Sequence, residues 1–144
     1  MNKKIKEYSA QFESKKRADN GEDYIILKDN APKELRESVR KAHGDSLPND
    51  WIYGTYADLL SILEGYEITD ANDLDNYRHE IVDNYVDIYT SDLTKWLGSN
   101  SNTYYLTRAL EDHQPKDGVQ ALGIAQYTAI DEIMSEIVNL LTSK

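Results

Sequence analysis

The sequence predicts a mainly α-helical protein, arranged as a compact bundle of about six to seven helices in one domain. Apolar residues recur at helical spacing through most of the 144 residues. Proline and glycine stand at the borders of several of these segments, where helices begin and end. The length is that of one ordinary domain, so we take residues 1–144 as a single unit.

The first helix is expected over residues 3–18, because Ile5, Tyr8 and Phe12 fall on one helical face. The next apolar run, YIILK at 24–28, is short and rich in residues that favour β-structure. This run is either one short strand or a buried extended connector, and the sequence leaves both alternatives open.

Two further helices are each bordered by proline and glycine, Pro32 with Gly44 and Pro48 with Gly65. The apolar stripe of the first contains Leu35, Val39 and Ala42. The wider apolar face of the second contains Trp51, Ile52, Tyr56, Leu59, Leu60 and Leu63.

The clearest helical periodicity lies in residues 73–89, where apolar residues recur every three or four positions. They are Leu74, Tyr77, Ile81, Tyr85 and Ile88. Shorter helices are expected at 92–98 and 103–113, followed by a long helix to the end of the chain. One face of the long helix contains Val119, Leu122, Ala125, Ala129, Ile130, Ile133, Ile137 and Leu141.

Composition limits the classes of protein to consider. There is no cysteine, which excludes disulfides, thiolate metal ligands and cysteine nucleophiles. No apolar run follows the basic start as in a secretion signal, and no stretch approaches the roughly 18 apolar residues that span a bilayer. We therefore expect a soluble cytoplasmic protein without membrane contact. Its 11 tyrosines are either partly buried core residues or part of a contact surface.

Charge is unevenly distributed along the chain. Residues 1–44 contain 11 basic and 8 acidic side chains, a net charge of +3. Residues 45–92 contain 1 basic and 12 acidic side chains, a net of −11, and residues 93–144 contain 4 and 6, a net of −2. The middle segment would repel nucleic-acid phosphates, so we expect no direct nucleic-acid binding there. It favours a cationic partner, a metal, or solubility alone.

The acidic residues of the 73–89 helix form their own stripe, since Glu80, Asp83 and Asp87 are spaced by three and four. Such carboxylates repeat every ~5–6 Å along a helix, a scale comparable with nucleic-acid phosphates. A protein with this row can occupy a basic channel as a DNA mimic. The ordinary alternative is a solvated helix face. The candidate partner-binding residues are Asp58, Glu64, Asp73, Asp75, Glu80, Asp83 and Asp87.

No motif indicates catalysis. Phosphate-binding, dinucleotide-binding and serine-hydrolase glycine motifs are all missing from the sequence. His79 and Asp83 have the i, i+4 spacing of two metal ligands on one helix, but the sequence identifies no third ligand. We therefore expect neither enzyme activity, nor catalytic residues, nor a metal or other cofactor. A metal-dependent enzyme that uses these two residues is the least favoured alternative.

The sequence contains four distinctive short motifs, AHGD at 42–45, PxDW at 48–51, SDLxxWL at 91–97 and QY at 126–127. Together they resemble those of a family of small, uncharacterised proteins encoded by phages, plasmids and other mobile elements. The resemblance covers roughly residues 31–138 and implies that residues 1–30 are a variable N-terminal extension. It implies no catalytic residues. It implies a bacterial host and a role against host defence, as in anti-CRISPR and antirestriction proteins.

The leading hypothesis is a non-enzymatic inhibitor that binds a basic host protein, such as a nuclease or CRISPR effector, through the acidic 45–92 region. The alternative is an accessory or scaffolding protein of a phage or mobile element that self-associates through its tyrosines. The sequence does not indicate the oligomeric state.

Overall fold

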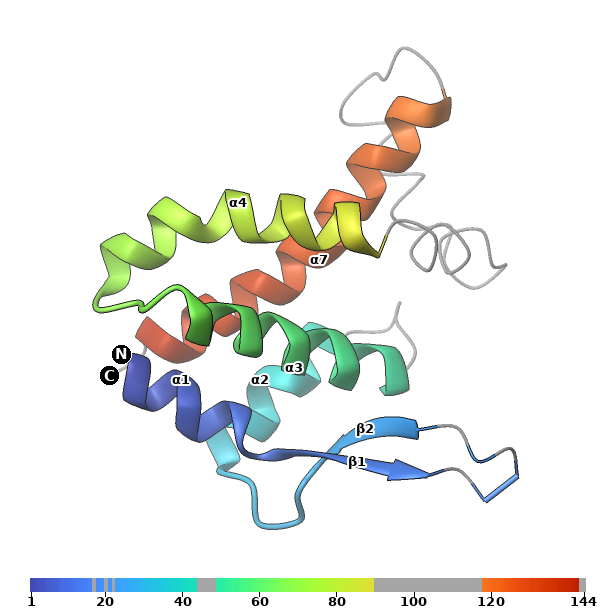
Figure 1. Ribbon diagram of the computed structural model, residues 1–144, viewed down its shortest axis with the longest axis vertical. Helices are drawn as coiled ribbons and strands as arrows, with labels where there is room; N and C mark the ends of the chain where they lie inside the picture. Colours follow the sequence, from blue (N-terminus) through green and yellow to red (C-terminus); the bar gives the residue numbers. More distant parts are fainter. Residues whose placement is uncertain (17, 20, 22, 44–48, 90–117, 143–144) are drawn as a thin grey trace.

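Helices make up most of the described part of this protein. The computed structural model describes residues 1–144 apart from 17, 20, 22, 44–48, 90–117 and 143–144 (Figure 1). The described residues form five helices and one two-stranded sheet. In chain order these are α1 (Asn2–Ser9), β1 (Phe12–Lys16), β2 (Asp23–Leu27), α2 (Lys33–His43), α3 (Asn49–Gly65), α4 (Ala71–Ile88) and α7 (Gly118–Thr142).

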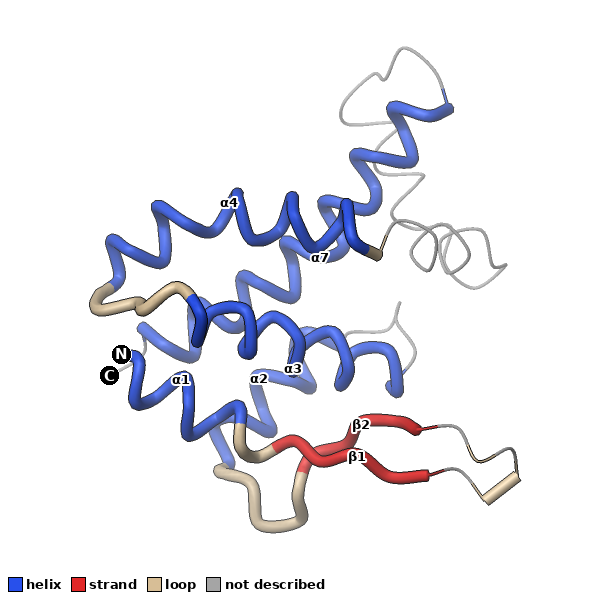
Figure 2. The backbone as a smooth tube through the Cα atoms, viewed as in Figure 1, coloured by secondary structure: helices blue, strands red, loops and turns tan. Residues whose placement is uncertain are grey.

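Helix α3 is the centre of the packing. It contacts α1, α2, α4, α7 and β2, and α4 lies on the opposite side of it from the β1–β2 hairpin (Figures 1 and 2). Because α3 has neighbours on several sides, its buried face is wide. The fully buried side chains of this face are Tyr56, Leu59, Leu60 and Leu63. The long α7 closes the core from another side, where it packs against α2 and α4.

The prediction of one helix over residues 3–18 is wrong for the second half of this range. Helix α1 ends at Ser9, and Phe12–Lys16 forms β1, which pairs antiparallel with β2. In this register Phe12 lies opposite Leu27, and its ring is 5.7 Å from that of Tyr56 on α3. Pairing with β2 satisfies the backbone and places Phe12 against the core, which outweighs the local helical pattern. Of the two alternatives for 24–28, the structure has the strand.

The predicted positions of the other described helices are confirmed, but the predicted apolar stripe of α4 needs a correction. Its buried residues are Leu74, Ile81, Val82, Tyr85 and Val86. Ile88, expected in the apolar stripe, is 70% exposed, and Tyr77 is 37% exposed. The reason is that α4 packs against both α3 and α7, so its buried face is turned toward the side that carries Val82 and Val86.

Some predictions fall on residues outside the described part of the chain. These are the helices at 92–98 and 103–113 and the helix end at Gly44. Residues 1–30, expected to be a variable extension, contribute Ile5, Tyr8 and Leu27 to the buried core. Across the described ranges, no helix combines the length and apolar character that a bilayer crossing requires.

Candidate functional site

The first turn of α4 is built by its own acidic residues. The Asp70 side chain accepts a hydrogen bond from the Asp73 backbone N–H at 3.0 Å, which caps the helix. The Asp73 carboxylate accepts from the backbone N–H of Thr69 at 3.0 Å and from the Thr69 hydroxyl. These hydrogen bonds lower the pKa of Asp73. Asp73, a predicted contact residue, therefore also has a structural role at the start of α4.

Three predicted contact residues share the outer face of α4. Glu80, Asp83 and Asp87 are all exposed and lie opposite the buried side that packs on α3 and α7. We call this set the acidic face of α4. Asp75 is exposed too, but it lies five positions before Glu80, so it projects from a different side of the helix.

The acidic face of α4 has no internal counterion within the described residues. Arg78 is the one basic residue between positions 45 and 92, and it is directed toward α7. Its Nε donates to Asp131 Oδ1 at 2.9 Å, and its other N–H groups donate to the Asp131 carbonyl and to Ser135 Oγ. Among the described side chains, no ion pair involves Glu80, Asp83 or Asp87.

Next to this face, His79 of α4 contacts Tyr127 of α7. The His79 Nδ1 and the Tyr127 hydroxyl are 2.8 Å apart, and the two rings lie 5.4 Å apart. Burial raises the pKa of Tyr127, and the carboxylates of Asp131 and Asp83 add to this. Within the described ranges, no three His, Asp or Glu side chains gather to hold a metal ion. The structure thus gives the His79 and Asp83 pair no third ligand in that part of the chain.

The two predicted contacts on α3 differ from the acidic face of α4. Asp58 is half-buried, and this burial raises its pKa. Glu64 is exposed. Thr55 marks the side of α3 that faces α4, because the Tyr85 hydroxyl donates to Thr55 Oγ1 at 3.3 Å. In the turn after α3, the Tyr66 ring is 5.0 Å from that of Tyr77 on α4.

Glu64 comes nine residues after Thr55, so at 3.6 residues per turn it lies on the opposite side of α3 from Thr55. The structure therefore gathers Glu80, Asp83 and Asp87 but does not bring Glu64 into the same row.

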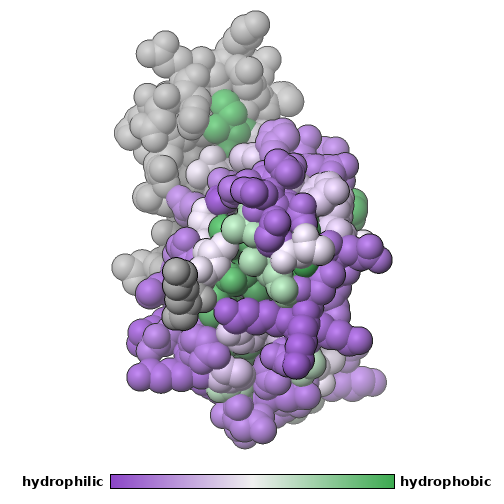
Figure 3. Space-filling model, turned by 90° about the vertical axis from the view of Figure 1, so that its left-hand side faces the viewer, coloured by the Kyte–Doolittle hydropathy of each residue, from purple (hydrophilic) through white to green (hydrophobic). Residues whose placement is uncertain are grey.

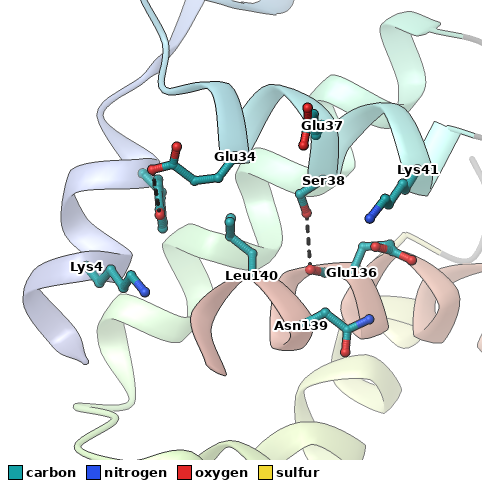
Figure 4. Close-up of a pocket in the computed structure, with 9 residues that line it drawn as sticks. Lys4, Glu34, Glu37, Ser38, Lys41, Glu136, Asn139 and Leu140 are labelled. Atoms are coloured by element: carbon teal, nitrogen blue, oxygen red, sulfur yellow. Dashed lines mark hydrogen bonds between the residues drawn. The ribbon is translucent and has the colours of Figure 1, made fainter. Parts of the chain in front are cut away.

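No sequence pattern predicts the pocket that lies between α1, α2 and the C-terminal half of α7. Its volume is about 440 Å³, and Figure 4 shows residues of all three helices around it. Its lining includes charged residues far apart in the chain, namely Lys4, Glu34, Lys41 and Glu136. No sequence motif joins them, because only tertiary packing brings these three helices together.

The face of the molecule that carries the start of α1 and the end of α7 is mainly hydrophilic, with a small hydrophobic area near its middle (Figure 3). A second, more open pocket lies on this side, between α1, the start of α4 and the end of α7. Its lining includes Met1, Lys3, Asp70 and Leu141.

Comparisons of this chain with protein-family models, with curated proteins and with solved structures found no match.

Proposed function

We propose that this protein is a non-enzymatic inhibitor that binds a basic surface of a host nucleic-acid-handling protein, of the nuclease or CRISPR-effector type. Glu80, Asp83 and Asp87 form the centre of the contact. The partner is basic because its charge must replace the counterions of these carboxylates. In this proposal the protein acts in the bacterial cytoplasm and touches neither nucleic acid nor membrane.

The observation that best supports this proposal is the row of three exposed carboxylates on α4. The neighbouring arginine side chain points toward α7 and does not pair with them. Surface helices usually mix charges of both signs, and i, i+4 pairs of opposite charge stabilise them. Here Arg78 binds Asp131 and Ser135 of α7 instead. Arg78 therefore does not neutralise the acidic face of α4, which can pair with an external cation.

The spacing of this row supports mimicry of a nucleic-acid strand. Residues three and four apart on a helix repeat every ~5–6 Å along its axis. This distance is similar in scale to the repeat of phosphates along one strand. The α4 backbone is anchored at its start by the Asp70 cap and at its middle by the Arg78–Asp131 pair, so the row is held on a rigid element. The resemblance to mobile-element proteins supplies the biological context.

The alternative function, self-association through tyrosines, has less support. Of the tyrosines whose burial the structure describes, Tyr8, Tyr56 and Tyr85 are buried in the core, and Tyr77 alone is classed as exposed. A mostly buried or half-buried set offers little aromatic area for a contact with a second copy.

The test is capture of partners from bacterial lysate on immobilised protein, at low salt and at about 0.5 M salt. We expect a basic nuclease or DNA-binding protein that is retained at low salt, released at high salt and displaced by added duplex DNA. The triple variant Glu80→Lys, Asp83→Lys and Asp87→Lys should lose this partner and keep its circular dichroism spectrum.

A matched control reverses three exposed carboxylates elsewhere, with Glu7→Lys, Asp19→Lys and Asp29→Lys. It changes the net charge by the same amount and should retain the partner. If both variants lost the partner equally, binding would depend only on net charge and not on the acidic face of α4. If the α4 variant still retained the partner, the proposal would be refuted.

A further inference from the structure

The pocket between α1, α2 and α7 is separate from the acidic face of α4, because no α4 residue lines it. Its volume of about 440 Å³ lies within the range of ligand-binding sites. Three of its lining residues, Tyr8, Ser38 and Leu140, are themselves buried. The pocket thus reaches down to the core and offers apolar area at Leu140.

Carboxylates from two helices lie around this apolar area. Glu34 and Glu37 belong to α2 and Glu136 to α7, while Lys4 and Lys41 lie at opposite ends of the pocket (Figure 4). Glu34 is oriented by the Tyr8 hydroxyl, which donates to its Oε1 at 3.2 Å. An apolar centre between carboxylates suits a ligand with an alkyl chain and a cationic head.

Glu136 is the carboxylate that most lacks a partner. Its residue is half-buried, and its backbone carbonyl accepts a hydrogen bond from Ser38 Oγ at 3.1 Å. Its carboxylate forms no ion pair or hydrogen bond with any other described side chain. Lys41 lies on the same side of the pocket (Figure 4) but is not paired with it. A partly desolvated carboxylate gains from a cation that can also donate hydrogen bonds.

The carboxylates of the pocket also affect two phenols beside it. Burial raises the pKa of Tyr8 to about 12, with Glu34 as the next cause. Burial also raises the pKa of Tyr56, and Glu136 contributes in the same direction. Glu34 and Glu136 thus add to the effect of burial, and the lining has three glutamates against two lysines, a net charge of −1.

We propose that this pocket binds an arginine side chain of a partner polypeptide, with its alkyl chain on Leu140 and its guanidinium between Glu136 and the glutamates of α2. A guanidinium is planar and presents several N–H donors in a fixed fork, so it can bridge carboxylates from two helices. This is a second contact, independent of the acidic face of α4.

The test is an NMR titration of the ¹⁵N-labelled full chain with N-acetyl-arginine amide. N-acetyl-citrulline amide is the comparator, since it has nearly the same shape without the charge. We expect saturable shifts of the Ser38, Asn139 and Leu140 amides with the arginine compound, and shifts less than about a tenth as large with citrulline. Glu136→Gln should weaken binding roughly threefold to tenfold, because it removes a charged hydrogen-bond acceptor. Glu67→Gln, the same change at an exposed residue in the turn after α3, should leave it unaltered.

Equal shifts with citrulline would overturn the proposal, as would unchanged affinity in Glu136→Gln or shifts confined to α4. The ligand comparison needs no variant, so it stands even if Glu136→Gln alters the fold. A negative result here leaves the lysate capture through Glu80, Asp83 and Asp87 unaffected.

Discussion

At the scale of single residues, the buried hydroxyl of Tyr56 depends on Ser38. The two oxygens are 2.6 Å apart, and Ser38 Oγ also lies 3.1 Å from the Glu136 carbonyl. A serine hydroxyl has one proton to donate. Because Ser38 donates that proton to the Glu136 carbonyl, Tyr56 is the donor in its bond to Ser38. Ser38 therefore links α2 to both α3 and α7.

This direction of donation predicts unequal effects of two deletions. Ser38→Ala leaves the Tyr56 hydroxyl, on a residue that is 0% exposed, without an acceptor, and should destabilise the protein by about 1–3 kcal/mol. Tyr56→Phe leaves Ser38 bonded to the Glu136 carbonyl and keeps the ring beside Phe12, so it should cost less, about 0.5–1.5 kcal/mol. Urea unfolding of both variants measures the difference. A larger loss of stability in Tyr56→Phe than in Ser38→Ala would contradict the assignment of Tyr56 as the donor.

Asp58 is the predicted contact whose ionisation the fold disfavours. Burial raises its pKa, so the folded state binds a proton more tightly than the unfolded state. Stability therefore increases as the pH falls through the raised pKa toward the ordinary value near 4. At pH values above the raised pKa, the folded protein bears the full free-energy cost of the partly buried, ionised Asp58 carboxylate.

Asp58→Asn removes this cost and should raise the melting temperature at pH 7. The gain should shrink as the pH falls and disappear below about pH 4, where the unfolded aspartate is protonated as well. Thermal unfolding from pH 3 to pH 8 provides the measurement, with exposed Glu64→Gln as the comparison. A lower melting temperature at pH 7 for Asp58→Asn would mean that the carboxylate makes a stabilising contact.

At the scale of elements, the contact between α4 and α7 combines apolar packing with one half-buried ion pair. The Arg78 and Asp131 side chains are 27% and 32% exposed, and Ser135 completes the arrangement. Lys33 and Glu37 on α2 form the contrasting case, with a 3.9 Å separation and 87% and 45% exposure. The two pairs should differ in energy because solvent screens the exposed one.

Arg78→Met should destabilise the protein by about 1–3 kcal/mol, since it leaves the partly buried Asp131 without its cation. Lys33→Met, the control, should cost less than about 0.5 kcal/mol. Chemical denaturation at two salt concentrations measures both effects. If the two substitutions had equal effects, the Arg78–Asp131 pair would be no stronger than a surface pair, and α4 would be held by its apolar residues alone.

At the scale of the whole molecule, the uneven charge of the sequence becomes an uneven charge in space. The strongly acidic segment includes α4, while the net positive segment forms α1, the β1–β2 hairpin and α2. Helix α4 and the hairpin lie on opposite sides of α3 (Figure 1). In the proposed complex with a basic partner, such a distribution would orient the protein so that α4 approaches first.

Local sequence patterns were sufficient to predict the mainly helical character and the positions of α2, α3, α4 and α7. The apolar periodicity of all four helices, and the proline and glycine borders of α2 and α3, are local signals that can be recognised without knowing the tertiary structure. The acidic row of Glu80, Asp83 and Asp87 was likewise predictable, because residues three and four apart share a helix face in any tertiary context.

Tertiary structure alone decided the rest. Phe12–Lys16 forms a strand because it pairs with β2 and because Phe12 packs beside Tyr56. The local sequence pattern of this segment predicts neither contact. Ile88 is exposed because α7 lies on the other side of α4. The direction of Arg78 and the pocket beside Glu136 depend on pairs of residues far apart in sequence. Periodicity describes one helix at a time, whereas these features arise from how the helices pack together.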